Sequence, residues 1–508
     1  MTLLEATTKE LKALHEKTGQ CHQWNQLSQS ILNQASAQLA VGDRAAAYVT
    51  NSVEKGVEVS AGLIRATNAF ASEREYWWWA AGRLADSQTA TSAIMSPDYR
   101  CRKLHAQLIR RMAQAIQGDV GHNNDLTLFF ELRSSPDREY RRRLFTTLMS
   151  GYSQVQQSMA ALVSIVSSDH ILALDTDPAN GPVGVSVPVA ERFVEFCRNN
   201  ATLMHNYVEM RAERLGVKRV EGWDLGVSLG GSSEEIDMGL ALELLKSTLD
   251  GFPVRFLDVF KQALAESWFN IRQEESRGQF RGGFTRNVYG VHPYVSLSWA
   301  NDIEHTFALA HEFGHAVHFT LANEHQPYWS AKPDQLSAEV AAAVMEWSLW
   351  RAHKGTDMGT KLVWGALRFL QQTFNFGMLT NLELNILSRS RQGQKVSSKW
   401  LTDAWADICK EYYGPKFNVT HGVGLGWCRQ QSLLEQYPFH SAAYGLARSV
   451  ALHMTGEQDV SLVEFMGSGG SVPGWSAIRE HTGVNLEHAT SFERLFDGFY
   501  DLVARLSR

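Results

Sequence analysis

Cysteine, proline and long apolar runs are all scarce in this 508-residue chain. The five cysteines are an odd number, lie far apart and form no CxxC pair, which argues against a disulfide framework and a cysteine zinc site. No stretch approaches the roughly 18 consecutive apolar residues of a membrane span. The N-terminal residues contain no apolar signal segment and no arginine-rich transit peptide. We therefore predict a cytoplasmic protein that does not contact a membrane.

An excess of one charge is also absent. The chain has 48 Lys and Arg against 54 Asp and Glu, a formal net charge of -6. This balance gives no strong attraction for nucleic acid or anionic lipid. We interpret the basic run REYRRRLF at 138–145 as one solvated helix face and not as a nucleic-acid site. No sequence feature indicates an oligomeric state.

Helical periodicity is what the sequence has in abundance. Apolar residues recur at i, i+3 and i+4 over long stretches of the chain, which only 12 prolines interrupt. The clearest strand candidate is HPYVSLSW at 292–299, a short alternating run of β-branched and aromatic residues. The sequence therefore predicts a mainly α fold with a small β element.

One segment, HTFALAHEFGHAVHF at 305–319, has a direct chemical meaning. Its HEFGH core at 311–315 puts two histidines four residues apart, on one helix face, so both imidazoles can reach one ion. Glu312 projects about 100° around the helix from His311, beside the ion, where it can take a proton from a bound water. Gly314 lowers helix propensity and suggests that another element packs closely against that turn.

A second predicted helix, SAEVAAAVMEWSLWRA at 337–352, offers the third ligand. It places Glu339 24 residues beyond His315. Two imidazoles and one carboxylate with an open position are a common catalytic zinc arrangement, although other divalent ions accept the same ligands. Glu346, two helical turns after Glu339, could hold a ligand imidazole by a hydrogen bond. The alternative for both glutamates is that they are solvent-facing acids. We predict one zinc ion per chain, bound by His311, His315 and Glu339.

These residues resemble the thimet oligopeptidase and oligoendopeptidase F family of zinc peptidases, and the oligoendopeptidase F branch more closely. The run RGGFTRNVYGVHPYVSLSWANDIEHTFALAHEFGHAVHF is similar to that family's glycine-rich loop, short strand and zinc helix, in the same order. SAEVAAAVMEW resembles its glutamate-ligand segment, and 207–225 and 464–486 resemble flanking segments. The likeness covers residues 205–490, and the first 200 residues match only in being helical.

The resemblance implies an ellipsoidal helical body with a deep central channel that admits short unfolded peptides. We expect an N-terminal helical region at 1–115, forming part of the channel wall, and a catalytic metallopeptidase domain at 116–508.

The resemblance also implies where substrate binds. The strand at 292–299 would be an exposed edge that pairs with the backbone of an extended peptide. The glycine-rich loop would cover the cleft, where glycines permit close backbone approach; an ordinary flexible turn is the alternative. The implied substrate-binding residues are Gly282, Gly283, Tyr294, Val295 and Ser296.

For the tetrahedral oxyanion, the resemblance implies a histidine and tyrosines from the segment GWCRQQSLLEQYPFHSAAYGLARS at 426–449. Tyr444 matches the family pattern, but the family's histidine position falls on Ser432. For Tyr437 and His440, simple packing is the alternative. Three residues could replace the missing histidine: Tyr437, His440 and His421.

Together these features predict a zinc metalloendopeptidase, an oligopeptidase that cleaves internal bonds of short peptides with Glu312 as general base. Two alternatives stay open. Ser432 motivates a zinc-binding pseudo-peptidase or partner-binding scaffold, and a similar site could serve an exopeptidase of narrow specificity.

Overall fold

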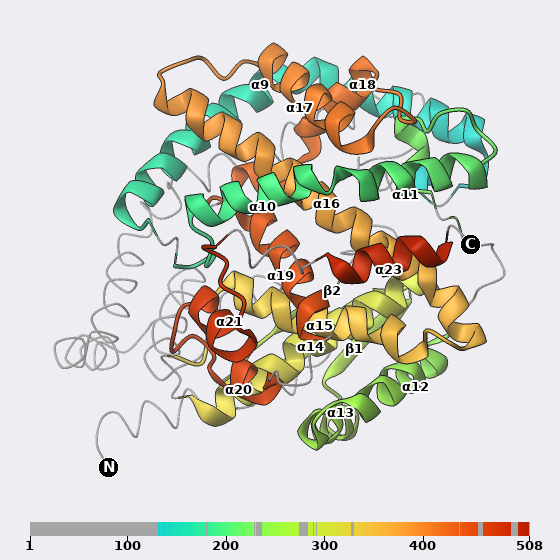
Figure 1. The fold of residues 1–508 in the computed structure, drawn as a ribbon, viewed down its shortest axis with the longest axis vertical. Coiled ribbons are helices and arrows are strands. Elements are labelled where there is room, and N and C mark those ends of the chain that lie inside the picture. The colour runs from blue at the N-terminus through green and yellow to red at the C-terminus, as the bar shows by residue number, and fades with distance from the viewer. Residues whose placement is uncertain are drawn as a thin grey trace, which may run out of the picture. The chain divides into compact units, whose positions relative to one another are not determined.

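The computed structural model describes residues 131–506, apart from residues 134, 228, 288, 291 and 436 and the segments 179–180, 230–235, 274–282, 327–329, 456–460 and 489–495. The described chain is mainly helical with one small three-stranded sheet, which confirms the predicted fold class (Figure 1). It divides into two compact units. The expected boundary between 115 and 116 lies outside the described residues, and so does Gly282.

Unit 1 contains the predicted metal ligands and comprises, within the described chain, residues 236–359 and 461–483. Its elements are α12 (Met238–Thr248), η2 (Leu249–Gly251), α13 (Val254–Ala265), β1 (Phe269–Gln273), β2 (Gly283–Arg286), β3 (Tyr294–Trp299), α14 (Ile303–His325), α15 (Gln335–His353), α20 (Leu462–Gly467) and α21 (Gly474–Thr482).

Helices α14 and α15 have strong N-terminal caps and pack closely on each other. Asp302 accepts a hydrogen bond from the His305 amide (2.8 Å), and Asp334 accepts from the Ser337 amide (2.9 Å), so both helices begin where a side chain satisfies a free N–H group. A Cβ atom on Gly314 would lie 2.6 Å from the Cα of Ala342. The close packing that the glycine suggested is therefore the approach of α15 to α14.

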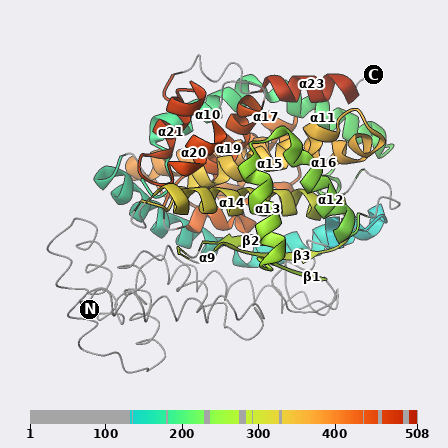
Figure 2. The same cartoon turned by 90° about the horizontal axis from the view of Figure 1, so that it is seen from below.

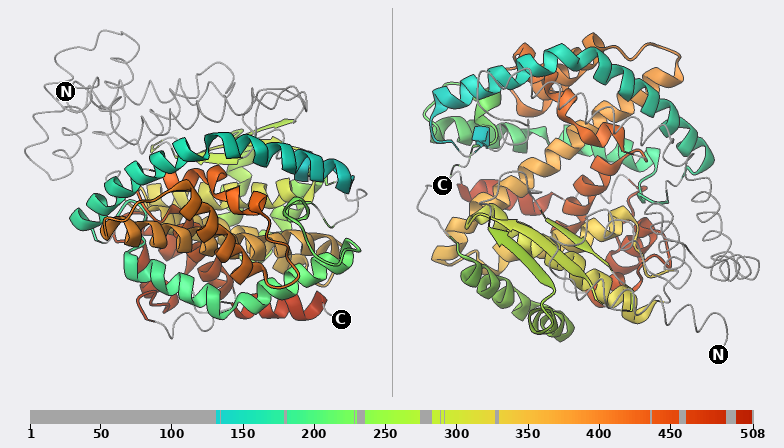
Figure 3. Two further views of the ribbon diagram at one scale, coloured as in Figure 1. Left: turned by 90° about the horizontal axis from the view of Figure 1, so that it is seen from above. Right: turned by 180° about the vertical axis from the view of Figure 1, so that it is seen from behind.

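The sheet has the order β1-β3-β2, with β1 parallel and β2 antiparallel to β3. Val295 of β3 lies opposite Phe269 on one side and Thr285 on the other. Figure 3 shows the three strands side by side, and contacts put α14 between the sheet and α15, as in Figure 2. Because β3 is the central strand and all six of its residues are buried, the expectation of an exposed edge at 292–299 is wrong.

Within the described residues, every named element of unit 2 is a helix. Its elements are α9 (Arg138–Thr176), α10 (Val187–Asn199), α11 (Ala201–Arg214), η1 (Gly222–Asp224), most of α16 (Asp357–Arg391), α17 (Ser398–Tyr413), α18 (His421–Gly424), η3 (Leu425–Arg429), η4 (Gln431–Leu434), α19 (His440–Met454) and α23 (Asp497–Leu506).

Helix α9 is the one described helix whose length and composition would suffice to cross a membrane. One face of α9 packs on η1, η3 and α17 and buries Leu144, Leu148 and Tyr152. Helices in the cores of soluble proteins can have the same length and composition, so these two properties do not indicate a membrane span.

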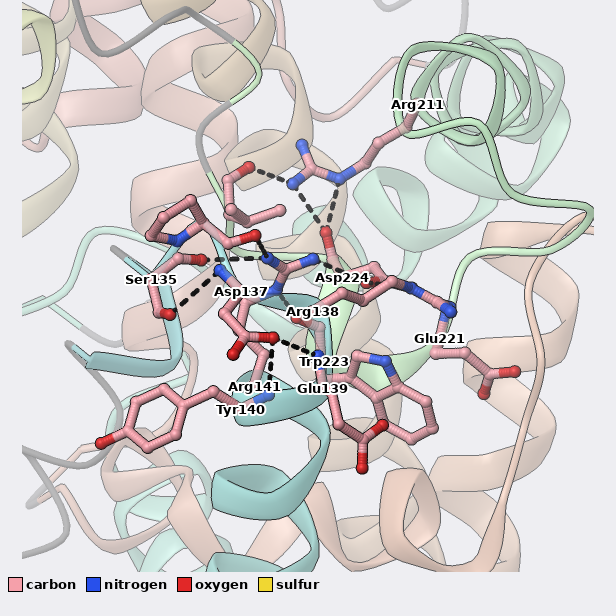
Figure 4. Close-up of polar contacts among 12 residues, drawn as sticks. Ser135, Asp137, Arg138, Glu139, Tyr140, Arg141, Arg211, Glu221, Trp223 and Asp224 are labelled. Carbon is pink, nitrogen blue, oxygen red and sulfur yellow. Dashed lines mark hydrogen bonds and ion pairs between the residues drawn. The ribbon is translucent and has the colours of Figure 1, made fainter.

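The start of α9 is held by a buried charge network (Figure 4). Asp224 is fully buried and accepts hydrogen bonds from Arg138 (2.8 Å) and Arg141 (3.1 Å). Arg211 donates to the main-chain oxygen of Asp224 (2.7 and 2.8 Å). The run at 138–145 is therefore not one solvated face, because Arg141 is only 2% exposed and neutralises a buried carboxylate.

Candidate metal centre and active site

The structure brings together the three residues predicted to bind metal. His311 and His315 lie one turn apart on α14, and Glu339 lies on the first turns of α15. Nε2 of His311 is 3.4 Å from Oε2 of Glu339, and Nε2 of His315 is 3.7 Å from Oε1 of Glu339. One ligand atom from each residue lies within 4.8 Å of the other two. The two helices thus converge three donor atoms on one point.

These separations fit a zinc ion. Bonds of about 2.0–2.2 Å in tetrahedral geometry put neighbouring ligand atoms about 3.3–3.6 Å apart. The observed 3.4 and 3.7 Å lie near that range. They exceed the roughly 2.9 Å of an ordinary N–H···O hydrogen bond, as expected for ligand atoms arranged around one ion. Three protein ligands leave one position for water or substrate.

Burial and charge act in opposite directions on the two histidines. Burial by itself lowers the pKa of His311, but hydrogen bonds and charge from Glu339 and Glu346 outweigh it and raise the pKa to about 10. Burial lowers the pKa of His315 to about 4, against the attraction of Glu339. The carboxylates thus favour one positive charge at this point, and a metal ion would supply it in exchange for the proton on His311.

Two further side chains hold the ligands in place. Oε2 of Glu346 lies 3.1 Å from Nδ1 of His311, which turns the other ring nitrogen toward Glu339. This is the contact predicted for Glu346. Nε2 of Gln335 donates to Oε1 of Glu339 (2.7 Å). Gln335 was not predicted from the sequence, although its position one helical turn before Glu339 was an available signal.

Glu312 is buried between α14 and β2. Its side chain accepts a hydrogen bond from the Thr285 hydroxyl (2.7 Å), and a Cβ atom on Gly283 would lie 2.7 Å from its Oε1 atom. Burial raises the pKa of Glu312 to about 7, although His311 and Thr285 lower it in part. A carboxyl with a pKa near neutrality can both accept and return a proton. Thr285 was not identified from the sequence, because nothing in the residues around it indicates a contact with Glu312.

The predicted substrate residues have a different environment from the expected one. Tyr294, Val295 and Ser296 are 3%, 0% and 1% exposed, and they belong to the central strand β3. Their strand has a neighbour on each side, so it has no free edge for a peptide. The expectation that these three residues pair with substrate backbone is therefore wrong. The residue that lies close to the backbone of Gly283 is Glu312.

The predicted oxyanion residues lie in unit 2, on elements described separately from the metal centre. His440 is the first residue of α19, and the preceding residue, Phe439, has a left-handed backbone (φ 67°). The Tyr444 ring stacks on Phe376, with ring centroids 5.3 Å apart. Ser432 lies in η4. The roles of Tyr437, His440 and Tyr444 stay predictions.

Comparison with known proteins adds independent information. The sequence model described as "Peptidase family M3" matches residues 131–493. Oligopeptidase PepF of Bacillus subtilis (strain 168) is 24% identical over 353 residues, 66% of this chain and 52% of that protein. The chromosomal oligoendopeptidase F of Lactococcus lactis subsp. cremoris is 22% identical over 405 residues, 76% of this chain and 66% of that protein. The chain thus spans about half of the first relative's length and about two thirds of the second's.

Solved structures support the same fold. A PZ peptidase A with an inhibitor superposes with a TM-score of 0.66 at 14% identity, covering 98% of this chain and 97% of that one. Oligoendopeptidase-F from Enterococcus faecium gives a TM-score of 0.56 at 14% identity, covering 98% and 99%. Because the family model spans more than half of the 508 residues, the chain belongs to peptidase family M3, as the resemblance predicted.

Proposed function

We propose that this chain is a zinc-dependent oligopeptidase that hydrolyses internal bonds of short unfolded peptides. The observation that carries the proposal is the convergence of His311, His315 and Glu339 beside the buried carboxyl of Glu312. Membership of a peptidase family supports the reaction class. The three cysteines in the described chain are free and buried, which supports a reducing, cytoplasmic location.

Each residue has a distinct task in this proposal. Zinc held by His311, His315 and Glu339 would polarise the scissile carbonyl and acidify a water molecule. Glu312 takes the proton of the attacking water and returns it to the leaving amine. Glu346 keeps the His311 ring in its binding orientation.

We assign substrate pairing to β2 in place of β3. Within the described residues β1 and β2 are the two edges of the sheet, and β2 carries Gly283, which lies against Glu312. An extended peptide that pairs along β2 would run beside the general base, as in other cases of strand addition. Tyr444, Tyr437 and His440 remain the proposed donors to the oxyanion.

The test is cleavage of quenched fluorescent peptides of graded length by the zinc-loaded protein. Glu312→Gln keeps the shape of the side chain but cannot accept a proton, so we expect kcat to fall by about 10²–10⁴-fold. Zinc content should not change. The matched control is Glu324→Gln, which alters a glutamate on the same helix that pairs with Arg255 at the surface. Equal turnover by wild type and Glu312→Gln would remove the assigned base.

A zinc-binding scaffold without peptidase activity is the second candidate, and Ser432 at the family's histidine position favours it. This candidate predicts bound zinc but no chelator-sensitive cleavage across a broad peptide library. Cleavage by the wild-type protein would exclude it. Product masses then separate an endopeptidase, which releases internal fragments, from an exopeptidase, which releases one or two terminal residues.

A further inference from the structure

The side chain of Glu312 leaves α14 toward β2, where a threonine meets it. Oγ1 of Thr285 lies 2.7 Å from Oε2 of Glu312 and 2.9 Å from the main-chain oxygen of the same residue. The position of Thr285 is itself fixed, because it pairs with Val295 of the central strand. One hydroxyl on a paired strand therefore contacts both the carboxyl group and the backbone of the same glutamate.

Gly283 also contacts the Glu312 side chain. It lies two residues before Thr285, on the same face of β2, and a Cβ atom there would meet Oε1 of Glu312 at 2.7 Å and its Cγ at 2.9 Å. Any larger residue would displace the carboxyl group. The strand thus limits the glutamate by close packing at one oxygen and by a hydrogen bond at the other.

We propose that Thr285 is the positioning residue for Glu312, so that β2 holds the general base in its working orientation. The inference rests on the proposed function only in the role of Glu312 as base. If substrate pairs with β2, the same strand also sets the distance between the peptide and the base. A shift of about 1 Å in such a geometry can cost 10²-fold in rate.

The hydroxyl of Thr285 suits both states that Glu312 adopts during proton transfer. A hydroxyl carries one proton and can accept on its oxygen. It donates to Glu312 while that carboxylate is charged. Once Glu312 has taken the proton, its carboxyl group can donate to Oγ1, and the hydroxyl can turn its own proton to the main-chain oxygen 2.9 Å away. Serine keeps this capacity, and valine removes it at nearly the same volume.

The experiment compares Thr285→Val and Thr285→Ser with Thr320→Val. Thr320 is a buried residue of α14 whose hydroxyl, among the described residues, donates to the main-chain oxygen of Ala316, so its loss reports the cost of a buried hydroxyl. For Thr285→Val we expect kcat to fall about 10- to 100-fold with little change in KM. Thr285→Ser should restore most of the rate, and Thr320→Val should match wild type. Zinc content should be equal in all four proteins.

Crystal structures of wild type and Thr285→Val provide a readout that needs no activity. We expect one ordered Glu312 side chain in the wild type and a displaced or multiple one in the valine variant. An unchanged Glu312 in Thr285→Val, or unchanged kcat in that variant, would overturn the positioning role. A wild-type protein that binds zinc but cleaves no peptide would end the proposed function, and the two structures would still decide the role of Thr285.

Discussion

Each of the two compact units buries a group of charged side chains, and the two groups are built differently. In unit 2, the carboxylate of Asp224 lies 2.8 Å from Arg138 and 3.1 Å from Arg141, and the Arg141 guanidinium also donates to the main-chain oxygen of Ser135 (Figure 4). In unit 1, the donor atoms of His311, His315 and Glu339 face each other at 3.4 and 3.7 Å. In the first group, the charged atoms form hydrogen bonds to other protein atoms. In the second group, the donor atoms surround a point where an ion could bind.

This difference separates a structural network from a binding site. Buried polar groups stabilise a fold only when partners offset the loss of water. The Asp224 network meets this condition and joins α9, α11 and the η1 turn. In the candidate metal centre, by contrast, the charges of Glu339 and Glu346 favour a cation beside the histidines. We therefore expect substitutions in unit 1 to change binding and those around Asp224 to change stability.

The largest expected effect is loss of the metal. Glu339→Ala removes one of three ligands, and we expect zinc to be lost on dialysis where wild type retains about one ion per chain. Chelator treatment of wild type should give the same metal content. Metal analysis and denaturant unfolding of both proteins measure this. Retention of zinc by Glu339→Ala would mean that the ion is bound elsewhere.

The second-largest expected effect is a loss of stability when the Asp224 network in unit 2 is broken. Asp224→Asn leaves Arg141 as a buried charge without its counter-ion, and breaking such a pair costs about 3–5 kcal/mol of unfolding free energy. Metal content of the folded protein should stay at the wild-type level. The control is Glu139→Gln, which removes the exposed partner of Arg142 on the same helix and should change stability far less. Similar unfolding midpoints for both variants would contradict a structural role for Asp224.

A smaller effect on metal affinity is expected when His311 is kept but the carboxylate that contacts it, Glu346, is changed. Glu346→Gln keeps the shape beside His311 but loses the charge that orients and polarises the imidazole. Changes at such supporting residues cost about 10- to 100-fold in metal affinity. Competition with a chromogenic chelator measures this affinity. An affinity equal to wild type would leave Glu346 as a simple packing residue.

Spacing along the chain was enough to predict that His311 and His315 lie on one face of α14, because positions four residues apart share a helix face whatever the rest of the fold does. Their role as metal ligands stays a prediction. The mainly helical class followed from the same periodicity. The central position of β3 was not predictable, because alternation in a strand reports which face is buried and not which edge is paired. Thr285 and Asp224 were missed for a related reason. Their partners, Glu312 and Arg141, are 27 and 83 residues away, and only the fold brings them together.

The smallest expected effect is a change in the pH dependence of stability, and it concerns Glu383. This residue is a buried carboxyl in unit 2, and Nδ1 of His170 lies 3.7 Å from its Oε1 atom. Burial raises its pKa to about 8 from an ordinary 4.5, and a hydrogen bond from the Phe439 amide lowers it in part. The folded protein then holds a proton that the unfolded chain releases between these values, so stability decreases as pH rises through this window.

One proton changes the free energy of unfolding by at most about 1.4 kcal/mol per pH unit. Between pH 6 and 7, wild type should therefore lose up to this amount relative to Glu383→Gln, whose amide does not titrate. Denaturant unfolding of both proteins at the two pH values measures the difference. Parallel pH dependence would mean that the folded wild-type protein does not hold this extra proton, and it would contradict a raised pKa for Glu383.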